Sequence, residues 1–240
     1  MELRGKTALV TGGAVRIGRA ICEALAAAGV NVVIHYWHSR SAAEVLRARL
    51  QKGGVRAWLV KAELRSEDAC VGLISDAVAA AGRFEILINN AAVFHKDSLR
   101  FTTAEKLLAE FWPNLFAPLL LTRAFVERCG SGRIVNLLDR RIASRDTSCV
   151  PYLLSKQALA ALTELAALEL APLFTVNGVA PGAILPPPGR GAAYLRDAAG
   201  PVPLQQPCTP ADVATAVVGL LQQEAVTGQI VYVDGGQHLL

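Results

Sequence analysis

Charge is scarce in this sequence of 240 residues, since only 18% of the residues are charged. The chain has 24 Lys and Arg residues and 20 Asp and Glu residues. A disordered chain would be rich in charge and poor in aliphatic side chains, whereas 52% of this chain is hydrophobic, so disorder is excluded. The small basic excess is scattered along the chain, which argues against a nucleic-acid-binding protein. At roughly 100–200 residues per domain, the length fits one large domain or two tightly joined ones, and we expect a single domain over residues 1–240.

Paired cysteines are also missing. The five cysteines are odd in number and none lies close to another (Cys22, Cys70, Cys129, Cys149 and Cys208). This pattern favours reduced thiols in a cytoplasmic protein over disulfides or a zinc site. No His, Cys and carboxylate residues cluster at the spacing of metal ligands, so no metal is expected.

A membrane-spanning segment is not expected either. The longest uncharged stretch, 170–189, is as long as a bilayer span but contains five prolines and three glycines, which a spanning helix would hardly accept. It is interpreted as a strand followed by a loop. The apolar run near the N-terminus is too short for a signal peptide.

Short β-branched runs alternate with longer Ala- and Leu-rich segments. Strands are predicted at Thr7–Thr11, Asn31–Tyr36, Val55–Val60, Phe84–Asn89, Arg133–Leu138, Phe174–Asn177 and Gln229–Val233. Helices are predicted near 17–28, 41–52, 67–81, 103–128, 152–170 and 210–223. Strands that are apolar throughout, each followed by a helix, indicate a doubly wound parallel sheet of seven strands with helices on both faces.

Local signals refine these helices. A capping box from Thr102 to Glu105 and an N-cap at Thr209, followed by proline at the first helical position, mark two helix starts. Pro113 is expected to kink the helix around it, because proline removes one backbone hydrogen bond. The Pro- and Gly-rich segment 183–209 follows the sixth strand, at the edge of the sheet where ligands bind, and is expected to cover a substrate.

A glycine turn follows the first strand. The segment from Thr11 to Arg19 contains Gly12 and Gly18 and leads into a helix, which would aim backbone N–H groups at a phosphate. The strict fingerprint with three spaced glycines is absent, so a glycine-rich turn without a ligand remains an alternative.

The end of the second strand distinguishes between nucleotides. An NAD site usually places an acid there to hold the ribose 2′-hydroxyl, but His35 to Ser41 contains none. Arg40, Ser39 and Ser41 could instead hold a 2′-phosphate, which favours NADP. Alternatively, Ser41 could cap the next helix.

Tyr152 and Lys156 lie four residues apart in a helical pattern and therefore share a face. A nearby ammonium lowers the pKa of a phenol from about 10, which would make Tyr152 a proton donor. Their position after the fifth strand brings them towards the nucleotide site.

Taken together, these motifs resemble the short-chain dehydrogenase/reductases. The resemblance extends over essentially the whole chain and adds motifs at 89–91, Asn114, 181–182 and 234–236. It implies a Rossmann-type fold, an NAD(P) cofactor, a homotetramer, and a water held by Asn114 and linked to Lys156. The positions it assigns to the cofactor, with those already described, are Thr11, Gly12, Arg16, Ile17, Gly18, His35, Tyr36, Ser39, Arg40, Ser41, Glu63, Leu64, Asn90, Ala91, Tyr152, Lys156, Pro181, Gly182 and Ile184.

Two departures resemble one branch, the pteridine reductases and the related bacterial dihydromonapterin or dihydrofolate reductases. Arg16 replaces a glycine, and Asp139 replaces a serine thirteen residues before Tyr152. The resemblance implies that Phe94 stacks on a pterin. The guanidinium of Arg16 has enough donors to span the cofactor phosphate and the pterin. Asp139 could share or relay the proton of Tyr152, or orient a water. Glu63 stands where many relatives carry an aspartate at the adenine.

Each assignment has an alternative. Asp139 could pair with Arg140 or Arg141, Phe94 could belong to the core, and Arg16 could be a solvated side chain. The expected activity is NADPH-dependent reduction of a C=N bond in a small pterin- or dihydrofolate-like substrate. A generic carbonyl or 3-oxoacyl reductase and a non-catalytic nucleotide-binding protein are the alternatives.

Overall fold

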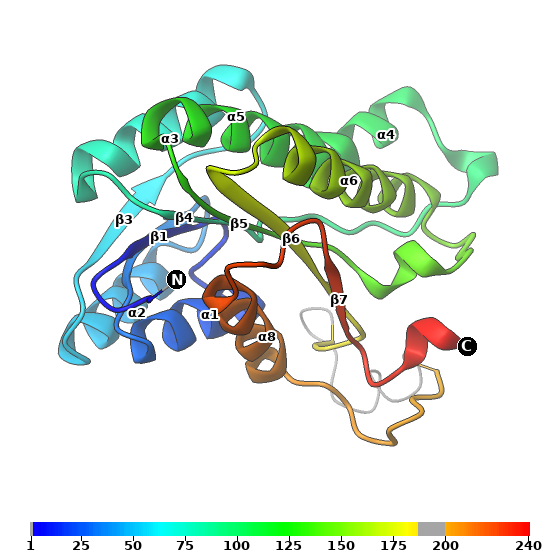
Figure 1. Cartoon of the computed structure of the whole chain (residues 1–240). Coiled ribbons are helices and arrows are strands. Elements are labelled where there is room, and N and C mark those ends of the chain that lie inside the picture. The colour runs from blue at the N-terminus through cyan, green and yellow to red at the C-terminus, as the bar shows by residue number, and fades with distance from the viewer. Residues whose placement is uncertain (1, 187–199) are drawn as a thin grey trace.

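The structure is a computed structural model that describes residues 2–186 and 200–240. All seven described strands form one parallel sheet in the order β3-β2-β1-β4-β5-β6-β7 (Figure 1). Their bounds are β1 Thr7–Val10, β2 Asn31–Tyr36, β3 Ala57–Lys61, β4 Ile86–Asn89, β5 Gly132–Leu137, β6 Phe174–Pro181 and β7 Ile230–Val233. The doubly wound parallel sheet predicted from the sequence is therefore confirmed.

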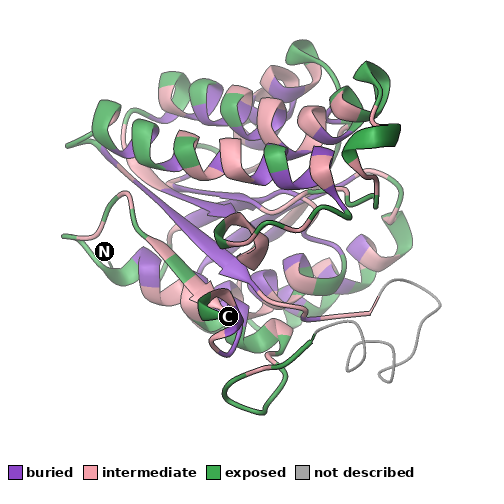
Figure 2. Cartoon of the chain, turned by 90° about the vertical axis from the view of Figure 1, so that its right-hand side faces the viewer, coloured by how far each residue is buried: buried purple, intermediate pink, exposed green. Residues whose placement is uncertain are grey.

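Helices cover both faces of the sheet (Figure 1). One layer contains α3 Glu67–Ala81, α4 Ala104–Phe111, α5 Ala117–Cys129 and α6 Val150–Glu169, and the other contains α1 Arg16–Ala27, α2 Arg40–Lys52 and α8 Pro210–Gln222. Two apolar clusters correspond to these layers, one between the sheet and α1, α2 and α8, the other beneath α3 and α5. Every residue of β1, β2 and β4 is buried, as a sheet covered on both faces requires, and the helices carry their exposed residues on their outer surfaces (Figure 2).

A row of buried polar side chains fixes α6 to the sheet. Asn89 and Asn136 occupy the same register on β4 and β5, and the Asn89 amide donates to the Asn136 oxygen at 2.9 Å. The Asn136 amide in turn donates to the hydroxyl of Thr163 on α6, also at 2.9 Å. Hydrogen bonds of this kind have specific geometry, so they set the position of the helix that carries Tyr152 and Lys156.

The predicted helix 103–128 is interrupted. It consists of α4, a π-helical turn η2 (Trp112–Phe116) and α5, so Pro113 does disturb the helix, through a widened turn. A π turn of this kind is a local interruption that is common at functional sites. Proline lacks the N–H that a regular α-helix would use at this point, which explains where the interruption falls.

The helix starts differ in detail from those predicted. The N-cap of α4 is Thr103, whose hydroxyl accepts from the N–H of Lys106, so the capping box starting at Thr102 is wrong by one residue. Thr209 caps α8 as predicted, with a capping box completed by Asp212. Strand β6 continues to Pro181, four residues beyond the predicted end, because Gly178 to Pro181 still pair with β7.

Among the residues that the structure describes, no helix combines the length and the apolar character needed to cross a bilayer.

Candidate active site

The glycine turn after β1 is closely packed. A Cβ on Gly18 would overlap the carbonyl oxygen of Gly12 and lie 2.6 Å from the Asn90 amide nitrogen. Only glycine therefore allows the first turn of α1 to approach the β1 end this closely. The N-terminus of α1 faces the carboxyl edge of the sheet, with the geometry that a phosphate group requires.

Thr11 and Asn90 connect this turn to the end of β4. The Thr11 hydroxyl accepts from the backbone N–H groups of Asn90 and Ala91, both at 2.9 Å. The Asn90 amide donates to the Thr11 carbonyl at 2.8 Å and to the Gly12 carbonyl at 3.2 Å. The two residues thus brace the crevice between β1 and β4, where the strand order reverses and ligands bind in open α/β sheets.

His35 lies beneath the glycine turn. Its buried ring accepts from the Gly12 N–H at 3.0 Å through Nδ1 and donates to the Ala62 carbonyl at 3.1 Å through Nε2. Both ring nitrogens are therefore already engaged by the backbone. Burial lowers the pKa of His35 to about 4, so the ring is neutral and supports the glycine turn from below.

Arg16 is held in an unusual backbone conformation. Its φ of +53° lies in the left-handed region, which non-glycine residues rarely adopt. Its guanidinium donates to the carbonyls of Leu185 and Pro186, at 3.3 and 3.1 Å, beyond the end of β6. Arg16 is therefore not simply solvated, since it connects the glycine turn to the segment that follows the sixth strand.

The end of β2 carries mixed charge. Arg40 is exposed at the start of α2 and pairs with Glu44 at 2.9 Å. Ser39 is the N-cap residue, and Ser41 lies inside the first turn, so the alternative of Ser41 as the cap is wrong. Lys61, which the sequence analysis missed, lies over the ring of Trp37 at 4.8 Å. Lys61 is paired in register with Tyr36 and adds a second cation to this end of the sheet.

The segment after β3 carries Glu63 and Leu64, which the sequence predicts to contact the cofactor. Leu64 is buried, whereas the Glu63 side chain is partly exposed and lies 3.6 Å from Arg65. Glu63 therefore reaches towards solvent at the edge of the crevice.

Tyr152 and Asp139 are in direct contact. The phenol donates to the Asp139 carboxylate at 2.8 Å, and Tyr152 is almost fully buried. Burial and the Asp139 charge raise the pKa of Tyr152 well above its ordinary value. The Tyr152 pKa is therefore raised, where the sequence predicts a lowered one, and a cation that acts on the phenol in the lowering direction is Arg141.

Lys156 is directed towards the sheet. Its ammonium donates to the Leu137 carbonyl at 2.7 Å, at the end of β5. Burial lowers the pKa of Lys156 to about 8, while Asp139 and Glu110 act in the opposite direction. An ammonium with a pKa near neutrality can be charged or neutral within the working range of an enzyme.

Arg141 is a second residue that the sequence analysis missed as part of the site. Its guanidinium contacts Asp139 at 3.2 Å and Asp146 at 3.0 Å, and lies 5.4 Å from the centre of the Phe94 ring. Phe94 also packs edge-on against Tyr152 at 4.7 Å and is 42% exposed, so it is a surface-accessible ring and not a core residue. Asp139 therefore forms an ion pair with Arg141 and also accepts a hydrogen bond from Tyr152.

Asn114 is fully buried in the π turn. Its oxygen accepts from the Val93 N–H at 3.0 Å, and its amide nitrogen lies within 3.1 Å of the Ser155 hydroxyl and 2.9 Å of the Glu110 carboxylate. The π turn thus directs Asn114 between the β4 end and α6.

A cavity of about 160 Å³ brings most of these groups together. Its lining consists of Ile17, Asn90, Ala92, Leu137, Leu138, Asp139, Tyr152, Lys156, Pro181 and Gly182. The two ends of the site identified in the sequence, the glycine turn and the Tyr–Lys pair, therefore face one cavity. Ile184, beside it, is buried.

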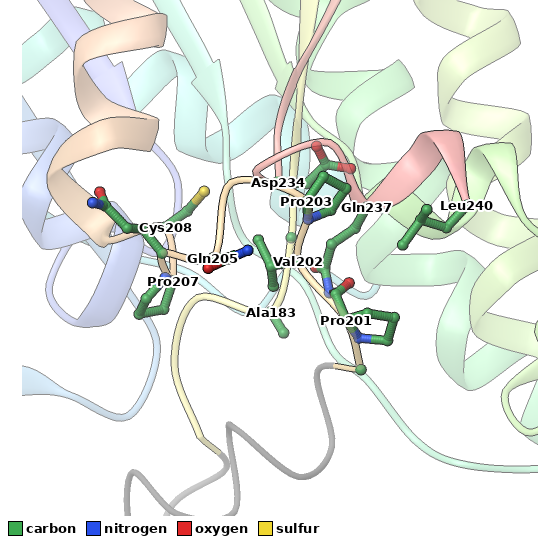
Figure 3. Close-up of a pocket in the computed structure, with 13 residues that line it drawn as sticks. Ala183, Pro201, Val202, Pro203, Gln205, Pro207, Cys208, Asp234, Gln237 and Leu240 are labelled. Carbon is green, nitrogen blue, oxygen red and sulfur yellow. The ribbon is translucent and has the colours of Figure 1, made fainter.

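A larger cavity, of about 800 Å³, opens beyond the end of β6 (Figure 3). Its walls are mostly apolar and include Ala183, Val202, Cys208 and Gln237, as well as Asp234 from the end of β7. The predicted covering segment 183–209 borders this cavity, but residues 187–199 of it lie outside the described part of the chain. Within the described ranges, no three His, Cys, Asp or Glu residues are grouped as metal ligands would be.

Known proteins resemble this chain over nearly its full length. A family model described as enoyl-(acyl carrier protein) reductase matches residues 13–238. The structure of FolM alternative dihydrofolate reductase 1 from Brucella canis, complexed with NADP, has a TM-score of 0.94 and 31% identity, and the match covers 100% of this chain and 96% of that one. Pteridine reductase 1 of Leishmania tarentolae is 32% identical over 97% of this chain and 96% of its own length. The putative ketoacyl reductase 2 of the granaticin polyketide synthase from Streptomyces violaceoruber is 34% identical over 97% of this chain and 96% of its own.

Proposed function

The chain belongs to the short-chain dehydrogenase/reductase family, and from this premise we propose that it is an NADPH-dependent reductase of a pterin- or dihydrofolate-type C=N bond. The observation that carries the proposal is the hydrogen bond from Tyr152 to Asp139, next to the accessible ring of Phe94. The Brucella protein named as a dihydrofolate reductase and the Leishmania pteridine reductase support the same substrate class.

The crevice fits a dinucleotide. The N-terminus of α1 and Arg16 would hold the pyrophosphate, and Arg40 with Lys61 would supply positive charge for a 2′-phosphate. Glu63, Leu64, Asn90 and Ala91 would border the adenosine, and Pro181, Gly182 and Ile184 the nicotinamide end. Bound NADPH supplies the hydride, and the protein supplies position and protons.

Tyr152 and Asp139 would act as one proton-holding unit. Because burial and Asp139 raise the Tyr152 pKa, the phenol stays protonated at neutral pH, and its proton lies between two oxygens 2.8 Å apart. An ionised carboxylate can only accept hydrogen bonds, so Asp139 would accept from a substrate N–H. Tyr152 would give its own proton to the ring nitrogen, and Asp139, once protonated from solvent, would return a proton to Tyr152. Arg141 donates to the same carboxylate and holds it in place.

Phe94 and Lys156 would complete the site. The accessible Phe94 ring offers a flat apolar face for a pterin, with Arg141 packed behind it. Lys156 would hold the nicotinamide ribose, and Asn114 a water linked to it. We further propose that residues 1–240 act as one catalytic domain in a cytoplasmic homotetramer, with 183–209 covering the substrate.

A carbonyl reductase is the second candidate, because the granaticin relative is named as a ketoacyl reductase. A ketone oxygen needs hydrogen-bond donors, and an ionised Asp139 cannot provide one. A serine at this position would provide one, so Asp139→Ser distinguishes the two candidates.

The deciding experiment measures NADPH oxidation with dihydrobiopterin, dihydromonapterin and dihydrofolate, and with an acetoacetyl thioester as the ketone. The proposal expects turnover of at least one pterin or folate and little of the ketone, with Asp139→Ser reversing this preference. Turnover of the ketone alone by the unaltered protein would overturn it. NADH replaces NADPH in a parallel series to test the cofactor assignment.

A further inference from the structure

One acid behind the catalytic residues is deeply buried. Glu110, in the last turn of α4, is 2% exposed and is the one buried residue of that helix. A buried carboxylate is costly unless it is paired and hydrogen-bonded, so its partners indicate what it is for.

The two carboxylate oxygens of Glu110 face in different directions. Oε1 accepts from the backbone N–H of His95 at 2.8 Å and contacts its ring Nδ1 at 2.7 Å. The His95 side chain is 70% exposed and borders a surface pocket of about 360 Å³. Oε2 accepts from the amide of Asn114 at 2.9 Å. Glu110 therefore connects a solvent-facing imidazole to the buried asparagine of the site.

The Asn114 amide has more acceptors than hydrogens. Its nitrogen lies 3.1 Å from the Val93 carbonyl, 3.1 Å from the Ser155 hydroxyl and 2.9 Å from Glu110. The Ser155 hydroxyl donates its own hydrogen to the Tyr152 carbonyl at 2.7 Å, so towards Asn114 it can only accept. Two N–H groups serve three acceptors, and the charged one forms the strongest bond. The charge on Glu110 thus decides how this amide is held.

Glu110 also acts on the catalytic lysine. The titratable groups around it are His95, Lys96 and Asp97 from the segment after β4, Lys106 on its own helix, and Lys156 on α6. Lys106 is paired with Asp97 at 2.6 Å. Lys156 has no carboxylate within ion-pair distance among the described residues, and its charged form is stabilised through space by Asp139 and Glu110.

We propose that Glu110 is a positioning residue, which orients the Asn114 amide and, together with Asp139, keeps Lys156 positively charged. The inference rests on the proposed hydride transfer but not on the identity of the substrate. It assigns a role in catalysis to a charge that touches neither substrate nor cofactor.

The direct test measures the titration of Lys156 in the free protein. The chain has six lysines, so 13C-labelled lysine gives a simple NMR spectrum in which Lys156→Arg identifies the signal of interest. We expect a midpoint of about 8 in the unaltered protein. Glu110→Gln, which keeps the shape and removes the charge, should lower the midpoint by about half a unit to one unit. Glu105→Gln, an exposed acid on the same helix, is the control and should leave it unchanged.

Kinetics supply the second measurement. In Glu110→Gln, the alkaline limb of the pH profile of kcat should move to lower pH by the same amount, with little change in the KM for NADPH. Glu110→Asp keeps the negative charge and should show a smaller shift. A Lys156 midpoint that is equal in Glu110→Gln and Glu105→Gln would overturn the inference, even in an active reductase. Conversely, a shifted midpoint in a protein that reduces no pterin would refute the proposed function and leave this inference standing.

Discussion

The left-handed conformation of Arg16 predicts that the usual order of stability of glycine and alanine variants is reversed at this position. At an ordinary exposed helical position, Gly is less stable than Ala by about 1 kcal/mol. A residue with a Cβ, however, loses about 1–2 kcal/mol when its φ is positive, and Arg16 has a φ of +53°. Arg16→Gly and Arg16→Ala both remove the guanidinium and its bonds to Leu185 and Pro186, so these two variants differ only in the Cβ.

Glycine has greater conformational freedom in the unfolded chain, which costs about 0.5–1 kcal/mol of stability. The strain of a Cβ at positive φ is larger than this cost. We therefore expect Arg16→Gly to be more stable than Arg16→Ala by up to about 1 kcal/mol, or a few degrees in Tm for a chain of this size. Both variants should bind NADPH more weakly than the unaltered protein, because both lack the cation at the phosphate turn.

Urea unfolding of the cofactor-free proteins, at one fixed protein concentration, measures this difference. Ala48, which is exposed within α2, provides the matched control, and Ala48→Gly should lose about 1 kcal/mol there. If Arg16→Ala proves as stable as Arg16→Gly, position 16 does not hold a strained backbone, and the reasoning fails.

Three further predictions concern single residues. The His35 pKa of about 4 lies below its unfolded value of 6.5, so the unfolded chain binds the proton first as the pH falls, and up to about 3 kcal/mol of stability is lost between pH 6.5 and 4. In His35→Asn, urea unfolding at pH 7 and 4.5 should show lower stability at pH 7 but a smaller acid loss, and an equal acid loss would contradict the assignment. Gly18→Ala should raise the Kd for NADPH at least about tenfold in fluorescence titrations, because its Cβ meets the Gly12 carbonyl. Tyr152→Phe should keep NADPH affinity and lose about 10²–10⁴-fold in kcat, and wild-type turnover would exclude Tyr152 as the proton donor.

Much of the fold could be predicted because each strand has a continuous apolar run that the sheet buries on both faces. The errors fall where local and tertiary effects compete. Gly178 to Pro181 resembles a loop in the sequence, yet these residues continue β6, since β7 offers a pairing edge. Pro113 predicts an interruption of the helix. The form of the interruption, a π turn, depends on packing against α6 and is not visible in the sequence.

The sequence singles out some residues of the candidate site and not others. Tyr152 and Lys156 stand out because their spacing on a helix that follows a strand has a chemical meaning, whereas Asp139 stands out only through the resemblance to one branch of the family. Glu110 and Arg141 do not, because charged side chains are usually solvated, and a sequence does not show which of them the fold encloses. The sign of the Tyr152 pKa shift was missed for the same reason, because it depends on the burial of the phenol and its contact with Asp139.

The order of the strands has a consequence for how the chain is made. β1 lies between β2 and β4, so one edge of the first strand to be synthesised stays unpaired until β4 has emerged, after two further strands and three helices. An unpaired apolar edge readily binds strands of other chains, and parallel pairing of distant segments is slow. We therefore expect the nascent chain to depend on chaperones during translation. The crevice between β1 and β4, which would receive a dinucleotide, can close only after β2 and β3 have been made.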